Sequence, residues 1–311
     1  MKKRVLSAML VAAMAMTAMP SQTFAEGALD AAQQTGKLSY DGYKEVWSDE
    51  FDGDSLNRAD WNVETHEKGW VNNELQEYVD SDENIQVKDG KLVINPVKKV
   101  ADGDTGSTKG VASYTSGRVS TQNKQTFIYG RFECRAKVPK GQGYLPAFWL
   151  MANDENVYGQ WPRCGEIDCM EVMGQETNKA YGTIHYGNPH SQSQGIYTIT
   201  DGADFSDDFH IYTCDWEPGK ITWYVDGVKY HEESEWHSTT VGQGTLAYPA
   251  PFDQPFYIIL NLAVGGSWVG NPNDETSFEN NPYVIDYVRV YQKDSYDEDV
   301  KRPGKISLVM S

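Results

Sequence analysis

From Tyr40 onward the chain consists of short apolar or alternating runs of four to eight residues, separated by turn-forming residues. Two such runs flank Asp226-Gly227, which is a strong signal for a two-residue hairpin turn. Further runs at 92–94, 256–263 and 284–291 have the composition of strands. A helical period of 3.6 residues is nowhere sustained. Many short strands without alternating helices predict an all-β fold, either an antiparallel sandwich or a barrel.

The charge balance disfavours several classes of partner. The chain has 45 Asp and Glu against 27 Lys and Arg, a net charge of −18. Such a chain repels phosphate backbones, so we expect no nucleic-acid partner. It also has 9 Trp and 19 Tyr against 10 Phe. These amphipathic aromatics favour flat surfaces that stack on neutral sugars, although a β-rich core explains them at least as well.

The first residues predict export. Lys2, Lys3 and Arg4 precede an apolar run of 15 residues at 5–19, which is short for a membrane span. A small residue, Ala25, follows, so residues 1–25 are predicted to be a signal peptide. We therefore expect a secreted, extracellular protein that has no membrane association after signal cleavage.

The four cysteines are Cys134, Cys164, Cys169 and Cys214. Export permits disulfides, and three pairings are possible, but four cysteines in so long a chain do not make a disulfide scaffold. Buried free thiols are slightly favoured. There is no C-x-x-C spacing, so the cysteines do not predict a zinc site.

The most informative segment places three carboxylates in a strand-like apolar stretch. On a strand, Glu166 and Asp168 share one face. Glu171 has the opposite parity, and a regular strand would bury it in the core at a cost of roughly several kcal/mol. One extra residue near Cys169-Met170, a β-bulge, would return Glu171 to the face of the other two. The parity therefore predicts either a bulge or a buried acid.

Like charges on one face raise the pKa of at least one carboxyl. A protonated acid beside an ionised carboxylate is what glycosidic bond cleavage requires, because one group protonates the leaving oxygen and the other attacks or stabilises the anomeric carbon. A solvated acidic edge, or a set of cation ligands, is the alternative interpretation of an arbitrary E-x-D-x-x-E pattern.

These residues resemble the E-x-D-x-x-E signature of glycoside hydrolase family 16, with the spacing typical of its laminarinase branch of endo-β-1,3-glucanases. Trp70-Val-Asn-Asn-Glu-Leu-Gln-Glu-Tyr78 resembles the family's W-G-N-x-E-L-Q-x-Y segment, with Val71 in place of the usual Gly. The resemblance covers about residues 42–293. Its other segments are 47–53, 114–118, 146–151, 185–187, 261–266 and 286–291.

The resemblance implies a jelly-roll β-sandwich, similar to legume lectins, with a concave substrate cleft. It also implies a retaining mechanism. By resemblance Glu166 is the nucleophile, Glu171 the general acid/base, and Asp168 a modulator of their pKa values. No cofactor is implied for catalysis.

Further residues match positions of the family that contact sugar. Trp149, Trp161 and Trp268 would stack on sugar rings, whereas core positions are favoured for Trp216 and Trp223. The polar matches are Asn72, Glu74, Arg118 and His185. A structural ion pair is an equal alternative for Arg118.

Many members of the family bind one structural calcium on the convex face. By resemblance the ligands would be the Asp286 carboxylate and backbone oxygens of Glu50 and Gly90. The partner expected from the resemblance is a β-glucan polysaccharide, and we expect a monomer. The predicted organisation is a signal peptide at 1–25, a short leader at 26–39, a catalytic β-sandwich at 40–293, and a charged tail or linker remnant at 294–311.

The function predicted is that of a secreted, retaining endo-β-1,3-glucanase. Mixed-linkage β-1,3-1,4-glucan is a second candidate substrate. One alternative is a related hydrolase or transglycosylase acting on another polysaccharide. Sulfated galactans among these would favour basic cleft residues, which the net charge disfavours. Another alternative is a lectin-like sugar-binding module, against which the presence of all three acids argues.

Overall fold

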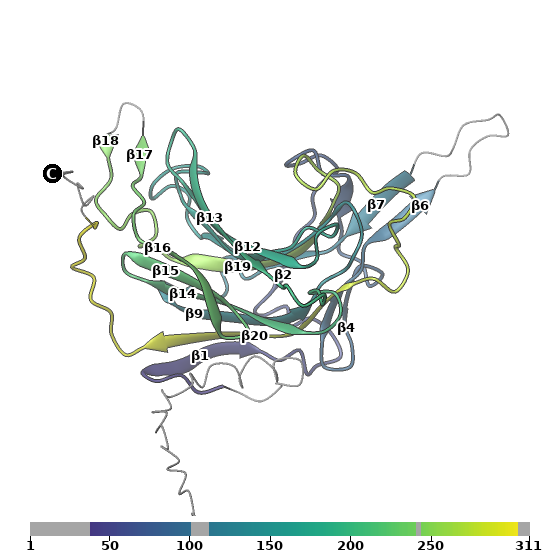
Figure 1. Cartoon of the computed structure of the whole chain (residues 1–311), viewed down its shortest axis with the longest axis horizontal. Helices are drawn as coiled ribbons and strands as arrows, with labels where there is room; N and C mark the ends of the chain where they lie inside the picture. Colours follow the sequence, from purple (N-terminus) through teal and green to yellow (C-terminus); the bar gives the residue numbers. More distant parts are fainter. Residues whose placement is uncertain (1–37, 101–111, 241–243, 304–311) are drawn as a thin grey trace, which may run out of the picture.

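The fold is a sandwich of two stacked antiparallel sheets that do not close into a barrel (Figure 1). The structure is a computed structural model that describes residues 38–100, 112–240 and 244–303. These residues form strands, and they include no helix that is long and apolar enough to cross a membrane. The all-β sandwich prediction is confirmed. The predicted signal peptide and nearly all of the leader lie outside the described residues.

The first large sheet has seven strands, and its free face is concave in Figure 1. Its strands, in spatial order, are β13 (Ser191–Thr198), β12 (Lys179–Tyr186), β11 (Glu166–Glu171), β10 (Tyr144–Ala152), β19 (Phe256–Val264), β8 (Arg118–Ser120) and β2 (Asn62–Val63).

The second large sheet has eight strands and packs against the convex face of the first. Its strands, in order, are β16 (Val228–Glu233), β15 (Lys220–Val225), β14 (His210–Glu217), β9 (Gly130–Lys137), β20 (Tyr283–Lys293), β5 (Leu92–Ile94) and β4 (Ile85–Val87), with β1 (Tyr43–Asp49) paired to β20. Two small sheets complete the described strands: β3 (Gln76–Tyr78) with β7 (Ala112–Ser116) and β6 (Val97–Val100), and β17 (Thr239–Thr240) with β18 (Gly244–Thr245).

The turn signals in the sequence have the expected effect. Asp226 and Gly227 connect β15 to β16 with φ angles of 49° and 77°, the left-handed conformation that a two-residue hairpin turn requires. The four cysteines are free and buried, which agrees with the slightly favoured prediction. Beyond β20, the predicted tail packs on the domain in its described part, because the Tyr296 ring lies 5.3 Å from the Tyr129 ring.

Alternation along the central strands separates core from cleft. In β10 the side chains of Phe148 and Leu150 belong to the core, whereas Trp149 and Met151 line a cavity on the concave side. β19 is buried over its whole length, including Asn261 and Ala263, which line the cavity. Trp216 and Trp223 are fully buried between the sheets, so the prediction of core positions for both is confirmed.

The alternation changes phase within β11. Trp149 pairs with Asp168 and Phe148 with Met170, so Cys169 is an extra residue relative to β10. The pairing with β12 shifts at the same place. Cys169 and Met170 are therefore both buried in the core, and this bulge returns Glu171 to the cleft face. Of the two alternatives that the parity left open, a bulge or a buried acid, the structure has the bulge.

The bulge is held from behind by a core tryptophan. The indole N–H of Trp223 donates a hydrogen bond to the backbone oxygen of Asp168 at 2.8 Å. Gly182, the β12 residue opposite the bulge, leaves room for this indole. A Cβ on Gly182 would lie 2.4 Å from Cδ1 of Trp223. The backbone of the acidic segment is thus supported by close packing as well as by strand pairing.

We expect Gly182→Ala to destabilise the protein, because an added methyl group must displace Trp223 behind the bulge. Overpacking of this kind costs about 1–3 kcal/mol in free energy of unfolding, measurable by urea denaturation. Gly53→Ala is the matched control, since a Cβ there would meet no atom closer than 3.4 Å. Equal stability of Gly182→Ala and wild type would contradict the packing described.

Candidate active site

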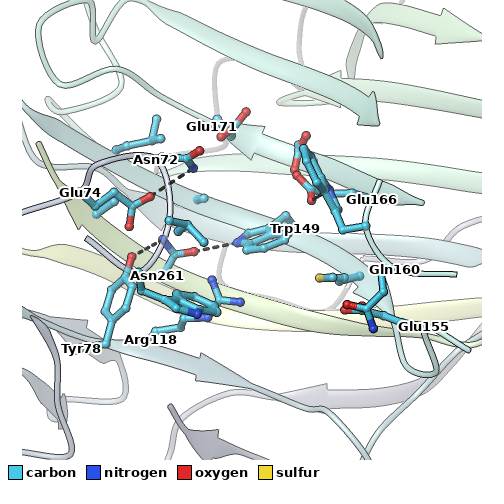
Figure 2. A pocket seen from close by; sticks show the side chains of 18 residues that line it. Asn72, Glu74, Tyr78, Arg118, Trp149, Glu155, Gln160, Glu166, Glu171 and Asn261 are labelled. Carbon is cyan, nitrogen blue, oxygen red and sulfur yellow. Dashed lines mark hydrogen bonds between the residues drawn. The ribbon is translucent and has the colours of Figure 1, made fainter. Parts of the chain in front are cut away.

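A cavity of about 380 Å³ lies on the concave side of the seven-stranded sheet. Its floor is formed by side chains of β10, β11 and β19. Tyr78 of β3, Arg118 of β8 and loop residues within 70–74 and 155–161 complete the lining. Figure 2 shows Trp149 in the middle of this cavity, with Glu74 toward one end and Glu155 and Gln160 toward the other. Of the residues predicted for the site, it is lined by Asn72, Glu74, Arg118, Trp149, Trp161, Glu166, Asp168 and Glu171.

The three predicted catalytic carboxyls lie together on this floor. Asp168 is almost completely buried, with only 4% of its side chain exposed, and Glu166 is 16% exposed. The indole N–H of Trp161 donates to Oε2 of Glu166 at 2.6 Å, which fixes the orientation of that carboxyl. Glu166 and Glu171 are therefore presented from the two ends of β11, with Asp168 between them.

Burial raises the pKa of all three acids, and their mutual repulsion adds to this effect for the two glutamates. The pKa of Glu166 rises to about 8, mainly through burial and then through the charge of Asp168. Burial raises the pKa of Asp168 to about 7. The pKa of Glu171 is raised well above its usual range by burial and by the charges of Asp168 and Glu166. Glu171 thus holds its proton more tightly than an ordinary glutamate, and the titrations of the three acids depend on one another.

His185 lies beside this pair, as the sequence predicted. It is the β12 partner of Glu166, and its Nε2 is 3.2 Å from Oδ2 of Asp168 and 3.9 Å from Oε1 of Glu166. Its other ring nitrogen, Nδ1, is 2.8 Å from Nε2 of His190. His190 follows β12 and was not predicted as a site residue, because nothing in the sequence shows that the loop folds back over His185.

A chain of hydrogen bonds fixes the central part of the floor. The Trp149 indole N–H donates to Asn261 at 2.7 Å, and Asn261 donates to the hydroxyl of Tyr78 at 3.0 Å (Figure 2). At one end Gln76 donates to Glu74 at 2.7 Å. Tyr78 and Asn261 line the cavity but were not predicted as site residues. For Asn261, the available signal was its position as a lone Asn in the apolar run of β19.

Arg118 forms an ion pair and also lines the cavity, and its contact with sugar stays a prediction. Its Nε donates to Oε2 of Glu64 at 2.5 Å, so it forms a nearly buried ion pair. Its guanidinium also lies between the rings of Trp70 and Trp149, 5.3 Å and 4.8 Å from their centroids, and it lines the cavity. Glu64 was not predicted from sequence. Although burial raises its pKa, the Arg118 charge and several hydrogen bonds lower the pKa of Glu64 overall.

Exposed tryptophans surround the cleft. Trp161 is 44% exposed and Trp268 43% exposed. Trp268 does not line the cavity itself. Its ring packs edge-on at 5.2 Å against Tyr181, the β12 partner of Glu171. Trp70 was missed as a site residue; it is half exposed and stacks flat on His66 with the ring centroids 3.5 Å apart. Exposed indoles at these places provide flat apolar surfaces at the rim.

The residues expected to bind calcium lie on the other large sheet and do not offer a free carboxylate. Oδ2 of Asp286 in β20 accepts a hydrogen bond from Arg135 at 2.6 Å, and its Oδ1 is 3.5 Å from Nζ of Lys91. Glu50 is paired through its side chain with Arg289. Two cations already neutralise the Asp286 carboxylate, so the arrangement described does not fit calcium. Calcium at Glu50, Gly90 and Asp286 remains a prediction.

The segment that contains the site matches a known protein family. The model of the family described as "Glycosyl hydrolases family 16" matches residues 72–289, which is more than half of the chain. The chain belongs to glycosyl hydrolases family 16. The predicted family and the predicted class of glycoside hydrolase are thereby confirmed, and the matched range contains all three acids of β11.

Individual members of family 16 are similar over most of the chain. A "Glucan endo-1,3-beta-glucosidase" of Cryptopygus antarcticus is 39% identical over 255 residues, which are 78% of this chain and 90% of the relative. A "Glucan endo-1,3-beta-glucosidase A1" of Niallia circulans is 40% identical over 261 residues, 80% of this chain but only 38% of that relative. The solved endo-beta-1,3-glucanase of Pyrococcus furiosus matches with a TM-score of 0.68 and 38% identity, over 82% of this chain and 97% of that one.

The raised pKa of Glu166 predicts a loss of stability with rising pH. A carboxyl whose pKa rises from 4.5 to about 8 on folding stabilises the native state at low pH, and this contribution is lost as the pH passes from about 4.5 to about 8. We expect the free energy of unfolding to fall more steeply over this window in wild type than in Glu166→Gln. Urea denaturation in pH steps measures both slopes, and parallel curves would show that the pKa is not raised.

Proposed function

We propose that this chain is a secreted, retaining endo-β-1,3-glucanase of the laminarinase type. The observation that carries the proposal is the placement of Glu166 and Glu171 on one cleft face, on either side of Asp168. The two similar relatives named above are described as acting on 1,3-linked glucan, and this supports the choice of substrate.

The reaction proposed is a double displacement. Glu166, in its ionised form, attacks the anomeric carbon, while Glu171 gives its proton to the leaving glycosidic oxygen. This forms a glycosyl ester on Glu166 and breaks the bond to the leaving sugar. Glu171, now ionised, takes a proton from water, which attacks the same carbon and releases Glu166. Net retention of the anomeric configuration follows from two inversions.

The electrostatics of the site support these roles. Glu171 has a pKa well above its usual range, as a general acid requires. Glu166 and Asp168 share protons as a pair, and the indole N–H of Trp161 stabilises negative charge on Glu166. The reaction uses the form in which Glu166 is ionised. Substrate binding then excludes water from a site whose charges are already in place.

The cleft also supports a neutral polymer. Among the described residues that line the cavity, five are acidic and Arg118 is the single basic one. Arg118 is already paired with Glu64. Sulfated or carboxylated polysaccharides would meet repulsion along this floor, whereas the exposed indoles of Trp161 and Trp268 suit the apolar faces of glucose. Export by a signal peptide at residues 1–25 remains part of the proposal.

We expect the chain to shorten laminarin rapidly, with barley mixed-linkage glucan as the comparison substrate. Glu166→Gln removes the nucleophile and should lower kcat by several orders of magnitude with little change in fold. Glu77→Gln is the control, because this variant makes the same substitution at an exposed position of β3. Reducing ends and product sizes, followed over time, measure the rate and whether cleavage is internal.

The outcomes separate the alternatives. Internal cleavage of laminarin that is lost in Glu166→Gln and retained in Glu77→Gln supports the proposal. Full activity in Glu166→Gln would contradict the role given to this residue. No cleavage of either glucan by a folded wild type would overturn the glucanase proposal and favour another polysaccharide or binding without catalysis.

A further inference from the structure

Three side chains in the cleft form a compact group of metal-binding atoms. Glu166, Asp168 and His185 each offer one ligand atom, and these atoms all lie within 4.8 Å of one another. The Nε2 of His185 is 3.2 Å from Oδ2 of Asp168 and 3.9 Å from Oε1 of Glu166. Ligands around a tetrahedral zinc ion, with bonds of about 2.0–2.2 Å, are about 3.3–3.5 Å apart. A small closing movement would bring the three atoms to that spacing.

The buried oxygen of Asp168 is the second observation that points to a ligand. Apart from its 3.2 Å contact with Nε2 of His185, Oδ2 of Asp168 has no hydrogen-bond partner among the described residues, although the side chain is 96% buried. A buried carboxylate oxygen without a donor is costly. It lies near Nε2 of His185, on the side where Glu166 also presents Oε1. The strand pairing of Glu166 with His185 keeps these groups together.

The remaining atoms of the group are held in a way that suits metal binding. Oε2 of Glu166 accepts the hydrogen bond of Trp161, which leaves Oε1 toward His185. Nδ1 of His185 is 2.8 Å from Nε2 of His190, so one of these two nitrogens carries the shared hydrogen. When Nδ1 of His185 carries it, the lone pair of Nε2 faces the carboxylates. Metal-binding histidines are commonly oriented by such an outer partner.

We propose that Glu166, Asp168 and His185 bind one divalent transition-metal ion, such as zinc, in the cleft of the free protein. One imidazole nitrogen and two carboxylate oxygens form a donor set that binds zinc, copper or nickel more tightly than magnesium or calcium. The cleft leaves the fourth position to water. The cysteines take no part in this site.

Binding of the metal would block the reaction assigned to the cleft. When Glu166 binds the metal, neither of its carboxylate oxygens is free to attack the anomeric carbon. Oε1 binds the ion, and Oε2 accepts the hydrogen bond of Trp161. Zinc should therefore inhibit reversibly and compete with glucan. This consequence rests on the proposed function, whereas the binding of the metal does not.

The test measures binding separately from activity. The full chain without a polyhistidine tag is titrated with zinc chloride by calorimetry at one fixed pH, and magnesium chloride serves as the comparison. We expect one zinc ion per chain and no heat with magnesium. Asp168→Asn and His185→Gln should weaken zinc binding at least tenfold, and His190→Gln about 10–100-fold, as for other outer partners.

The matched control is His237→Gln, which makes the same change as His185→Gln at an exposed position. It should bind zinc like wild type. Glu171→Gln should also keep its zinc affinity, although it loses any glucanase activity. Melting temperatures in the presence of EDTA show whether each variant is folded.

The outcomes for the metal and for the enzyme can be distinguished. Zinc binding that is lost in the ligand variants supports the site, even when no glucan is cleaved. Inhibition that glucan relieves and EDTA reverses supports both proposals together. No zinc binding by the folded wild type overturns the site while glucanase activity stands. Unchanged affinity in folded Asp168→Asn and His185→Gln would also overturn it.

Discussion

Glu171 reaches the cleft because β11 contains one residue more than the strands beside it. Side chains of a regular strand alternate between two faces, so an acid five residues after Glu166 would point into the core. The extra residue at Cys169 reverses the alternation and gives the core two consecutive buried side chains, Cys169 and Met170. The acidic pair, the buried core of the sandwich and the floor of the cleft all depend on this local irregularity.

The chemistry of the cleft follows from placing several acids where few hydrogen-bond donors are available. Trp161 supplies one donor to Glu166, and Oδ2 of Asp168 has none among the described residues. Burial and repulsion raise the pKa values of the group, which is the condition that the proposed acid and nucleophile require. The same shortage of donors makes the group attractive to a cation with a preference for nitrogen and oxygen ligands.

The sequence predicted the features that arise from local periodicity. The parity of Glu171 indicated either a bulge or a buried acid, and the bulge is present. Asp226-Gly227 indicated the hairpin between β15 and β16. Strand alternation and motif resemblance also led to Trp149 and Trp161. Glu64 could not be predicted, because its partner Arg118 is far from it in the chain. His190 could not be predicted, because its contact with His185 depends on how the loop after β12 folds back. The side-chain pairing of Asp286 with Arg135 has the same long-range origin.

The central claim, that the bulge brings Glu171 to the cleft face on which Glu166 acts as the nucleophile, is tested most directly by trapping the covalent intermediate. A 2-deoxy-2-fluoro laminaribiosyl fluoride should form a glycosyl ester that hydrolyses slowly, because the fluorine destabilises the positive charge of the transition state. Peptide mapping by mass spectrometry then locates the added sugar. The account predicts one sugar adduct on Glu166. An adduct on Glu171, or on a residue outside β11, would contradict it.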